Sequence, residues 1–249
     1  MERVQEIFRQ RQSLSYERFL DFTPLNRAQK SYLTEVYAVL GGTVLLSTIG
    51  VQIYRYIYPI PFFLCAIVQF FCATYIFSTQ GTYQSYKDSQ CLKRIGALTS
   101  LSMLSGCSLA PLIDYANFLN PNILSSALLA TAVSFVCFSL GALFAKERKY
   151  LYLGSILTSA LSYLSLVSIF NLLFSSSLAQ DVVLYAGLFV YLGFIVYDTQ
   201  SILHEHKCGT RDPILHAFTF YVDIIGLFVR LLHLLTQREQ KRMQEKKRT

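Results

Sequence analysis

The chain has 249 residues, of which 53% are hydrophobic and 15% are charged, with a formal net charge of +7 and a mean hydropathy of +0.40. Ordinary soluble domains contain about 25% charged residues, so the composition excludes a typical soluble protein, a disordered chain and a collagen-like fibre. It predicts a polytopic membrane protein that lies in the lipid bilayer and does not bind nucleic acid.

The first 33 residues are polar and of mixed charge, and they lack the apolar core of a signal peptide. Seven apolar runs follow, each close to the roughly 20 residues that span a bilayer. In chain order the runs are Val36–Ile53, Ile60–Phe77, Ile95–Ile113, Ile123–Ala145, Tyr150–Phe174, Val182–Leu203 and Pro213–Leu235.

Spans in lipid must satisfy their own backbone hydrogen bonds, and the alternating pattern of a membrane barrel is missing from these runs. We therefore predict an all-α polytopic membrane protein, a bundle of six to seven transmembrane helices. Its parts are a cytoplasmic N-terminal segment over residues 1–33, a helical membrane domain over 34–235 and a basic cytoplasmic tail over 236–249.

Small residues recur at four-residue intervals in the third run, at Ser102, Gly106 and Ala110. On a helix this spacing places them on one face, where small side chains let a neighbouring backbone approach closely in lipid. We therefore expect a compact bundle with close helix crossings.

Lysine and arginine residues are concentrated in alternate polar segments. From the N-terminal segment to the loop before the last run, the segments hold 6, 1, 3, 0, 3, 0 and 2 of them. Because basic loops stay in the cytoplasm, this pattern predicts a cytoplasmic N-terminus.

The basic tail complicates this topology, because seven full spans would place its six lysines and arginines on the far side. We therefore expect the seventh run to be an inserted or re-entrant helix, shielded by the other six, with the C-terminus also in the cytoplasm. The alternative is a full span that breaks the charge rule, which is a bias and not a law.

Ionisable side chains within the apolar runs are concentrated in the last two. A charge at the bilayer centre costs about 2.5–3.5 kcal/mol, so such residues are functional candidates. Asp198 lies near the end of the sixth run and Asp223 near the middle of the seventh. His216, Asp223 and Arg230 are seven residues apart and so share one helical face.

If the last two helices pack together, Asp198 and Asp223 can meet. Two carboxylates in a site of low dielectric cannot easily both ionise, and they would titrate as a unit. A shared proton would make a pH-sensitive latch, whereas full ionisation would make an oxygen-rich site suited to Ca²⁺. The alternative is structural, with each aspartate capping a helix or bonding a hydroxyl such as that of Thr199. Arg94 is a candidate basic partner, unless it only anchors the membrane boundary.

The sequence carries no GxSxG, HExxH or CxxC motif, so we expect no enzyme, no cofactor and no resident metal site. The tail is a solvated basic run by default and can contact anionic lipid. Lys246 and Lys247, close to its end, resemble the dilysine signal that retrieves membrane proteins to the endoplasmic reticulum. That signal works only on a cytoplasmic tail.

From about Tyr37 to Leu235 the chain resembles the Bax inhibitor-1 family in order, spacing and length. The matching segments are APLID with NPNIL (Ala110–Leu124), TAVSFVCFSLGALFAKERKYLYLGSIL (Thr131–Leu157), YAGLFVYLGFIVYDTQSI (Tyr185–Ile202) and HAFTFYVDIIGLFVRLLHLL (His216–Leu235). The resemblance implies a bundle whose last helix is central, in a protein of the endoplasmic reticulum membrane.

The resemblance also implies a function: suppression of programmed cell death, with a pH-sensitive Ca²⁺ leak that lowers the stored Ca²⁺. Asp198 and Asp223 match the family's proposed pH sensor and gate, and Arg94 is the counterpart of a basic partner in a bacterial relative. Lys246 and Lys247 would belong to a tail associated with pH response, and Bcl-2-type proteins are implied partners. Two alternatives remain, a proton-coupled Ca²⁺ transporter and a non-conducting membrane adaptor that binds such proteins.

Overall fold

The computed structural model describes residues 27–57, 59–80, 89–144, 153–174 and 176–248. Within these ranges the chain forms seven helices and no strand. They are α2 (Arg27–Tyr56), α3 (Phe62–Ser78), α4 (Ser89–Leu119), α5 (Asn122–Phe144), α6 (Leu153–Phe174), α7 (Ser177–Lys207) and α8 (Pro213–Arg248). Each helix overlaps one of the seven predicted runs, so the all-α prediction is confirmed. The first described helix begins at Arg27, within the segment that we assigned to the polar N-terminal part.

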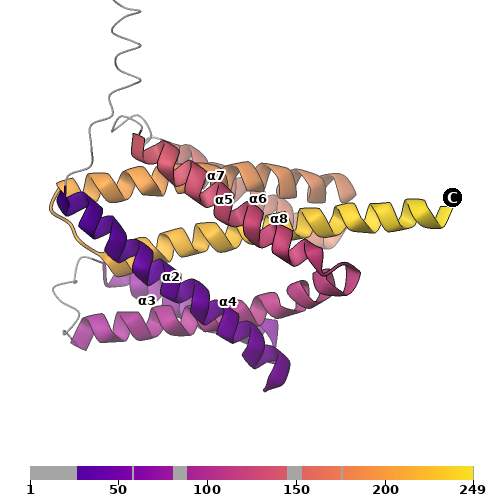
Figure 1. Cartoon of the computed structure of the whole chain (residues 1–249), viewed down its shortest axis with the longest axis horizontal. Coiled ribbons are helices and arrows are strands. Elements are labelled where there is room, and N and C mark those ends of the chain that lie inside the picture. The colour runs from indigo at the N-terminus through magenta and orange to yellow at the C-terminus, as the bar shows by residue number, and fades with distance from the viewer. Residues whose placement is uncertain (1–26, 58, 81–88, 145–152, 175, 249) are drawn as a thin grey trace, which may run out of the picture.

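Six of these helices are long and apolar enough to cross a membrane, and α3, with 17 residues, is shorter. The chain is therefore a multi-pass membrane protein. Successive helices run in opposite directions along the bundle (Figure 1). We call its two ends the Arg27 end, which also holds the connection over residues 208–212, and the Asn120 end, which holds the connection between α4 and α5.

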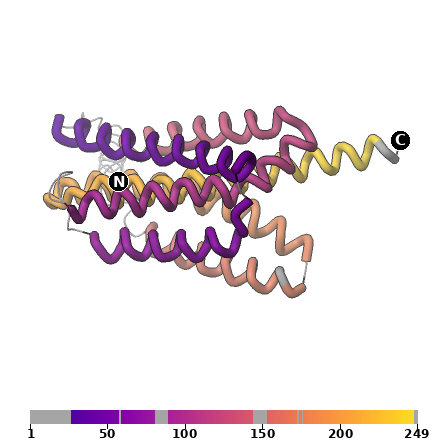
Figure 2. Tube along the Cα trace, turned by 90° about the horizontal axis from the view of Figure 1, so that it is seen from below, coloured from indigo at the N-terminus to yellow at the C-terminus, as the bar shows by residue number. Residues whose placement is uncertain are grey.

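Helix α8 lies in the middle of the bundle, where it contacts α2, α4, α5 and α7 (Figures 1 and 2). In its apolar window 44% of the residues are buried, against 17% to 33% in the five other long helices. The predicted central position of the last helix is therefore confirmed. Polar groups of α8 such as His216 and Asp223 are therefore buried against protein.

We expected an inserted or re-entrant helix for the seventh run, and α8 is a single unbroken helix. It is one helix of 36 residues, about 54 Å long at 1.5 Å per residue, which exceeds the roughly 30 Å of a bilayer core. Near its C-terminal end Asn120 Nδ2 donates to Glu239 at 3.3 Å, and Gln240 donates to the Tyr115 hydroxyl. The tail thus continues as helix at the Asn120 end, opposite the start of α2, and extends past the other helices (Figure 2).

Helices α2 and α4 cross closely because small residues line their contact. Ser102, Gly106 and Ala110 are all buried, and a Cβ on Gly106 would overlap the backbone oxygen of Ser47 on α2. The thiol of Cys107 also lies 3.2 Å from the Gly50 carbonyl oxygen across this contact. The small-residue stripe therefore works as expected, by letting two backbones approach each other.

Candidate functional site

Helices α7 and α8 are antiparallel neighbours joined by the five residues 208–212. Along their contact, polar and aromatic side chains meet at seven-residue intervals on both helices, which is two helical turns. The pairs are Glu205 with His216, Asp198 with Asp223, and Tyr191 with Arg230. We call this row the α7–α8 seam. The three residues of α8 that share one face by sequence therefore all meet α7.

The middle pair of the seam consists of the two aspartates. Their carboxyl groups lie within hydrogen-bonding reach of each other, and the Thr219 hydroxyl is also within reach of Asp198. Asp223 is buried, Asp198 is half-buried, and Oδ2 of Asp223 is buried without a hydrogen-bond partner among the described residues. A proton shared between the two carboxyl groups would give that oxygen a partner.

The purely structural role considered for Asp198 involved Thr199. The Thr199 hydroxyl is buried and donates to the Ile195 carbonyl oxygen at 2.6 Å, one turn back on the same helix. That bond uses the hydroxyl proton within α7. The nearest polar neighbours of Asp198 thus come from α8 and not from its own chain neighbour.

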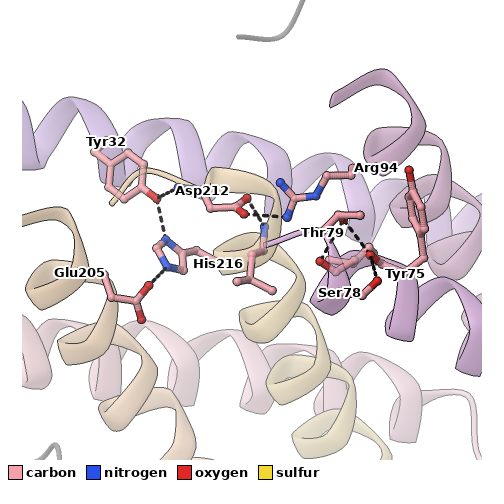
Figure 3. Close-up of polar contacts among 10 residues, drawn as sticks. Tyr32, Tyr75, Ser78, Thr79, Arg94, Glu205, Asp212 and His216 are labelled. Atoms are coloured by element: carbon pink, nitrogen blue, oxygen red, sulfur yellow. Dashed lines mark hydrogen bonds and ion pairs between the residues drawn. The ribbon is translucent and has the colours of Figure 1, made fainter. Parts of the chain in front are cut away.

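A second polar cluster surrounds Tyr32 at the Arg27 end (Figure 3). The Tyr32 hydroxyl accepts the backbone N–H of Asp212 at 3.0 Å and lies 2.6 Å from Nδ1 of His216. Nε2 of His216 lies 3.0 Å from the Glu205 carboxylate. When Tyr32 donates its own proton to Nδ1, Nε2 carries the ring proton and donates it to Glu205, so every group in the row has a partner.

Arg94 extends this cluster into α4, and its partner is Asp212. The guanidinium donates to the Asp212 carboxylate at 2.7 Å, and the two residues are 0% and 1% exposed. Asp212 also accepts the backbone N–H of Leu215 and so caps the start of α8. Among the described residues, the ion partner of Arg94 is therefore Asp212 and not the aspartate pair for which we considered it.

Asp212, Tyr32 and Glu205 were not among the residues predicted from the sequence. One local signal was present, because an aspartate directly before Pro213 fits the cap and first position of a helix. Tyr32 and Glu205 gave no such signal, since their role depends on contacts between segments 184 and 11 residues apart. The cluster joins α2, α4, α7 and α8 at one end of the bundle (Figure 3).

The cluster opens to solvent on one side. The Glu205 side chain is 41% exposed, and the exposed Arg211 pairs with Glu35 at 3.1 Å while lying over the Tyr32 ring. The His206 ring stacks on the Tyr32 ring, with the two ring centroids 4.6 Å apart. A row of polar contacts thus runs from the surface at the Arg27 end, through Glu205 and His216, toward the aspartate pair.

The remaining predicted residues lie elsewhere. Lys246 and Lys247 belong to the last turns of α8, far along the helix from the aspartates, and the Lys247 side chain is outside the described part of the structure. No three His, Cys, Asp or Glu side chains of the described ranges converge on a common point. A cation at the aspartate pair would therefore draw its other ligands from carbonyl groups and water.

The chain matches the family described as inhibitor of apoptosis-promoting Bax1 over residues 29–240. It is 36% identical over 218 residues to Bax inhibitor 1 of Drosophila melanogaster, which covers 88% of this chain and 87% of the relative. It is 32% identical over 235 residues to Bax inhibitor 1 of Homo sapiens, with 94% and 97% covered. A match to Bax inhibitor 1 of Oryza sativa subsp. japonica has 38% identity over 157 residues. Because the family match covers most of the helical bundle, the chain belongs to the Bax inhibitor-1 family.

Proposed function

We propose that this protein suppresses programmed cell death in the endoplasmic reticulum membrane, as a pH-sensitive Ca²⁺ leak channel gated by Asp198 and Asp223. Membership of the Bax inhibitor-1 family supports the first part, the suppression of cell death. The observation that carries the second part is the contact between two carboxyl groups inside an apolar helical bundle. Such groups are costly in a membrane, and a structural role alone does not require two of them together.

The gate works through the number of protons on the pair. With one proton, one carboxyl group donates to the other, and α7 is tied to α8 in the closed state. Without that proton, two negative charges face each other in a medium of low dielectric and repel. The helices then separate, and the ionised oxygens face the path of Ca²⁺, which prefers oxygen ligands.

The Glu205–His216 pair biases this equilibrium from the surface. It lies two turns from the aspartates on the same seam, and both side chains are within electrostatic reach of Asp198. A change in the charge of either side chain alters the electrostatic potential at the aspartates, so the Glu205–His216 pair links the surface at the Arg27 end to the buried carboxyl groups.

We assign the Arg27 end to the cytoplasm, because the described helix ends that flank the basic segments of the sequence meet there. Since α8 runs the whole bundle, its tail then lies in the lumen. The cytoplasmic tail that we expected, with Lys246 and Lys247 as a retrieval signal, is the alternative, and the two orientations place the C-terminus on opposite sides of the membrane.

The test measures Ca²⁺ flux in proteoliposomes that contain the purified chain, at a series of pH values on each side. The variants are Asp198→Asn and Asp223→Asn, and the matched control is Asp181→Asn at the other end of α7. An asparagine amide donates permanently to the remaining carboxylate and so imitates the shared proton. We expect flux in the wild type and the control to depend on pH, and flux in both pair variants to lose that dependence.

Each other outcome has a defined meaning. Flux that a pH gradient drives against the Ca²⁺ gradient would make the protein a proton-coupled transporter with the same carboxylates. Pair variants with the pH profile of the wild type would refute the gate. Wild-type flux no higher than that of empty vesicles would refute the channel and favour an adaptor that binds Bcl-2-type proteins.

A further inference from the structure

The third pair of the seam holds an arginine in a fixed position. The Arg230 guanidinium lies over the Tyr191 ring, 4.3 Å from its centroid, and its Nη1 donates to the Gly226 carbonyl oxygen at 3.1 Å. A Cβ on Gly187 would overlap Nε of Arg230, and a Cβ on Gly226 would overlap the Tyr191 ring. Two glycines thus leave the space in which the guanidinium and its aromatic neighbour lie.

This guanidinium lacks a counter-ion among the described residues. No carboxylate of that part of the chain lies within ion-pair distance of Arg230, whereas Arg55, at the same end of the bundle, pairs with Asp114. Its Nε is buried without a hydrogen-bond partner. The cation–π contact offsets part of the cost of burial, but it does not neutralise the charge.

A cavity of about 320 Å³ lies beside the guanidinium, between α6, α7 and α8. Its polar lining residues are Ser168, Asn171, Gln180, Arg230 and His233. Asn171 accepts the Ser176 backbone N–H through its oxygen, which leaves its amide NH₂ group as a donor. The volume lies in the range of ligand sites, and the lining combines a fixed cation with several donors and no carboxylate.

The cavity lies at the lipid-facing rim of the Asn120 end. Asn171 and Gln180 are each about one turn from the helix ends at Phe174 and Ser177. Leu173, Phe174 and Leu178 around them are at least 75% exposed, so acyl chains surround the opening. An anionic group at this depth comes most directly from a lipid headgroup.

We propose that Arg230, with His233 and the polar residues of this cavity, binds the phosphate group of an anionic membrane lipid. A guanidinium offers parallel N–H donors that match two phosphate oxygens. Free phosphate has the same chemistry, and the experiment separates the two sources. The proposal is independent of the Ca²⁺ leak.

The test uses the purified full-length chain in a non-ionic detergent. Native mass spectrometry counts adducts with phosphatidylglycerol and with the zwitterionic phosphatidylcholine, and thermal unfolding is followed with and without inorganic phosphate. The variants are Arg230→Gln, Arg230→Lys and Gly187→Ala, and the matched control is Arg238→Gln, an exposed arginine two turns further along α8. Circular dichroism verifies that each variant is helical.

We expect the wild type and Arg238→Gln to retain phosphatidylglycerol, and Arg230→Gln to bind it roughly tenfold more weakly. Arg230→Lys should bind phosphatidylglycerol more tightly than Arg230→Gln does, because it keeps the positive charge. Gly187→Ala should bind it more weakly than the wild type, because the new methyl group displaces the Arg230 guanidinium although the charge is retained. Stabilisation by inorganic phosphate that depends on Arg230 would extend the site to free phosphate. Adducts that are equal in the wild type and Arg230→Gln, or absent from the wild type, would overturn the proposal.

Discussion

The Arg94 guanidinium donates to the Asp212 carboxylate across 118 residues of sequence, and neither side chain is more than 2% exposed. This pair joins α4 to the start of α8, directly beside the short connection from α7. The ion pair fixes the start of α8 at the Arg27 end of the seam. Asp223 and then Arg230 lie further along α8 from this fixed position.

Removal of the Arg94 charge should destabilise the fold strongly. Arg94→Gln leaves the Asp212 carboxylate buried without its cation, which costs about 3–5 kcal/mol of unfolding free energy. Arg55→Gln breaks the partly exposed pair with Asp114 and should cost only about 0–1 kcal/mol. Denaturant titration of the purified variants measures both values. Equal losses in the two variants would contradict a special role for the buried pair.

Loss of the Tyr32 hydroxyl should affect two groups at once. In Tyr32→Phe the Asp212 backbone N–H and Nδ1 of His216 lose their shared partner, at a cost of about 1–3 kcal/mol. Tyr163→Phe is the control, because that tyrosine is 66% exposed on α6. Thermal unfolding separates the two variants, and no difference in melting temperature between them would show that the hydroxyl contributes little.

Two glycine substitutions should have opposite signs. At Gly106 a methyl group overlaps the Ser47 backbone oxygen, so Gly106→Ala should push α2 from α4 and destabilise the bundle. At Gly41 no atom lies within 4 Å of the new methyl group, and Gly41→Ala should gain up to about 1 kcal/mol in helix propensity. Melting temperatures of the two variants check this, and destabilisation by both would refute the steric explanation.

The path of α8 predicts the location of the C-terminus. A glycosylation acceptor added after Thr249 should be modified in microsomes, because α8 takes the tail to the luminal side in the proposed orientation. An acceptor inserted between Gln80 and Ser89, at the Arg27 end, should stay unmodified. The reverse pattern would show that the bundle has the opposite orientation in the membrane. Two unmodified sites would show that both lie in the cytoplasm, as the re-entrant helix predicts.

Much of the fold follows from local signals. Apolar runs locate the seven described helices, and the stripe from Ser102 to Ala110 locates one close crossing. The helical tail was also readable, since residues 236–248 contain strong helix formers and neither glycine nor proline. The charge rule favoured a re-entrant helix for the seventh run. That rule is a statistical bias on loops, and it does not register that one continuous helix can pack through the whole core.

The candidate site was only partly readable. Asp198 and Asp223 stand out because carboxylates are rare in apolar runs, and their contact requires only that the last two helices pack. The partner of Arg94 was not readable, because Asp212 precedes the apolar run and is identical in pattern to a solvated loop residue. Which buried groups meet depends on the relative depth of α2, α4 and α8, and no single segment encodes that depth.

The seven-residue repeat of the seam has a mechanical consequence. Over four turns a helix is stiff, so α8 cannot rotate about its axis at Asp223 alone. A rotation that parts the aspartates also moves His216 from Glu205 and Arg230 from the Tyr191 ring. The three pairs of the seam therefore part together when α8 rotates. Any event that stabilises the Glu205–His216 pair or the Tyr191–Arg230 pair also makes it harder to separate the two carboxyl groups between them.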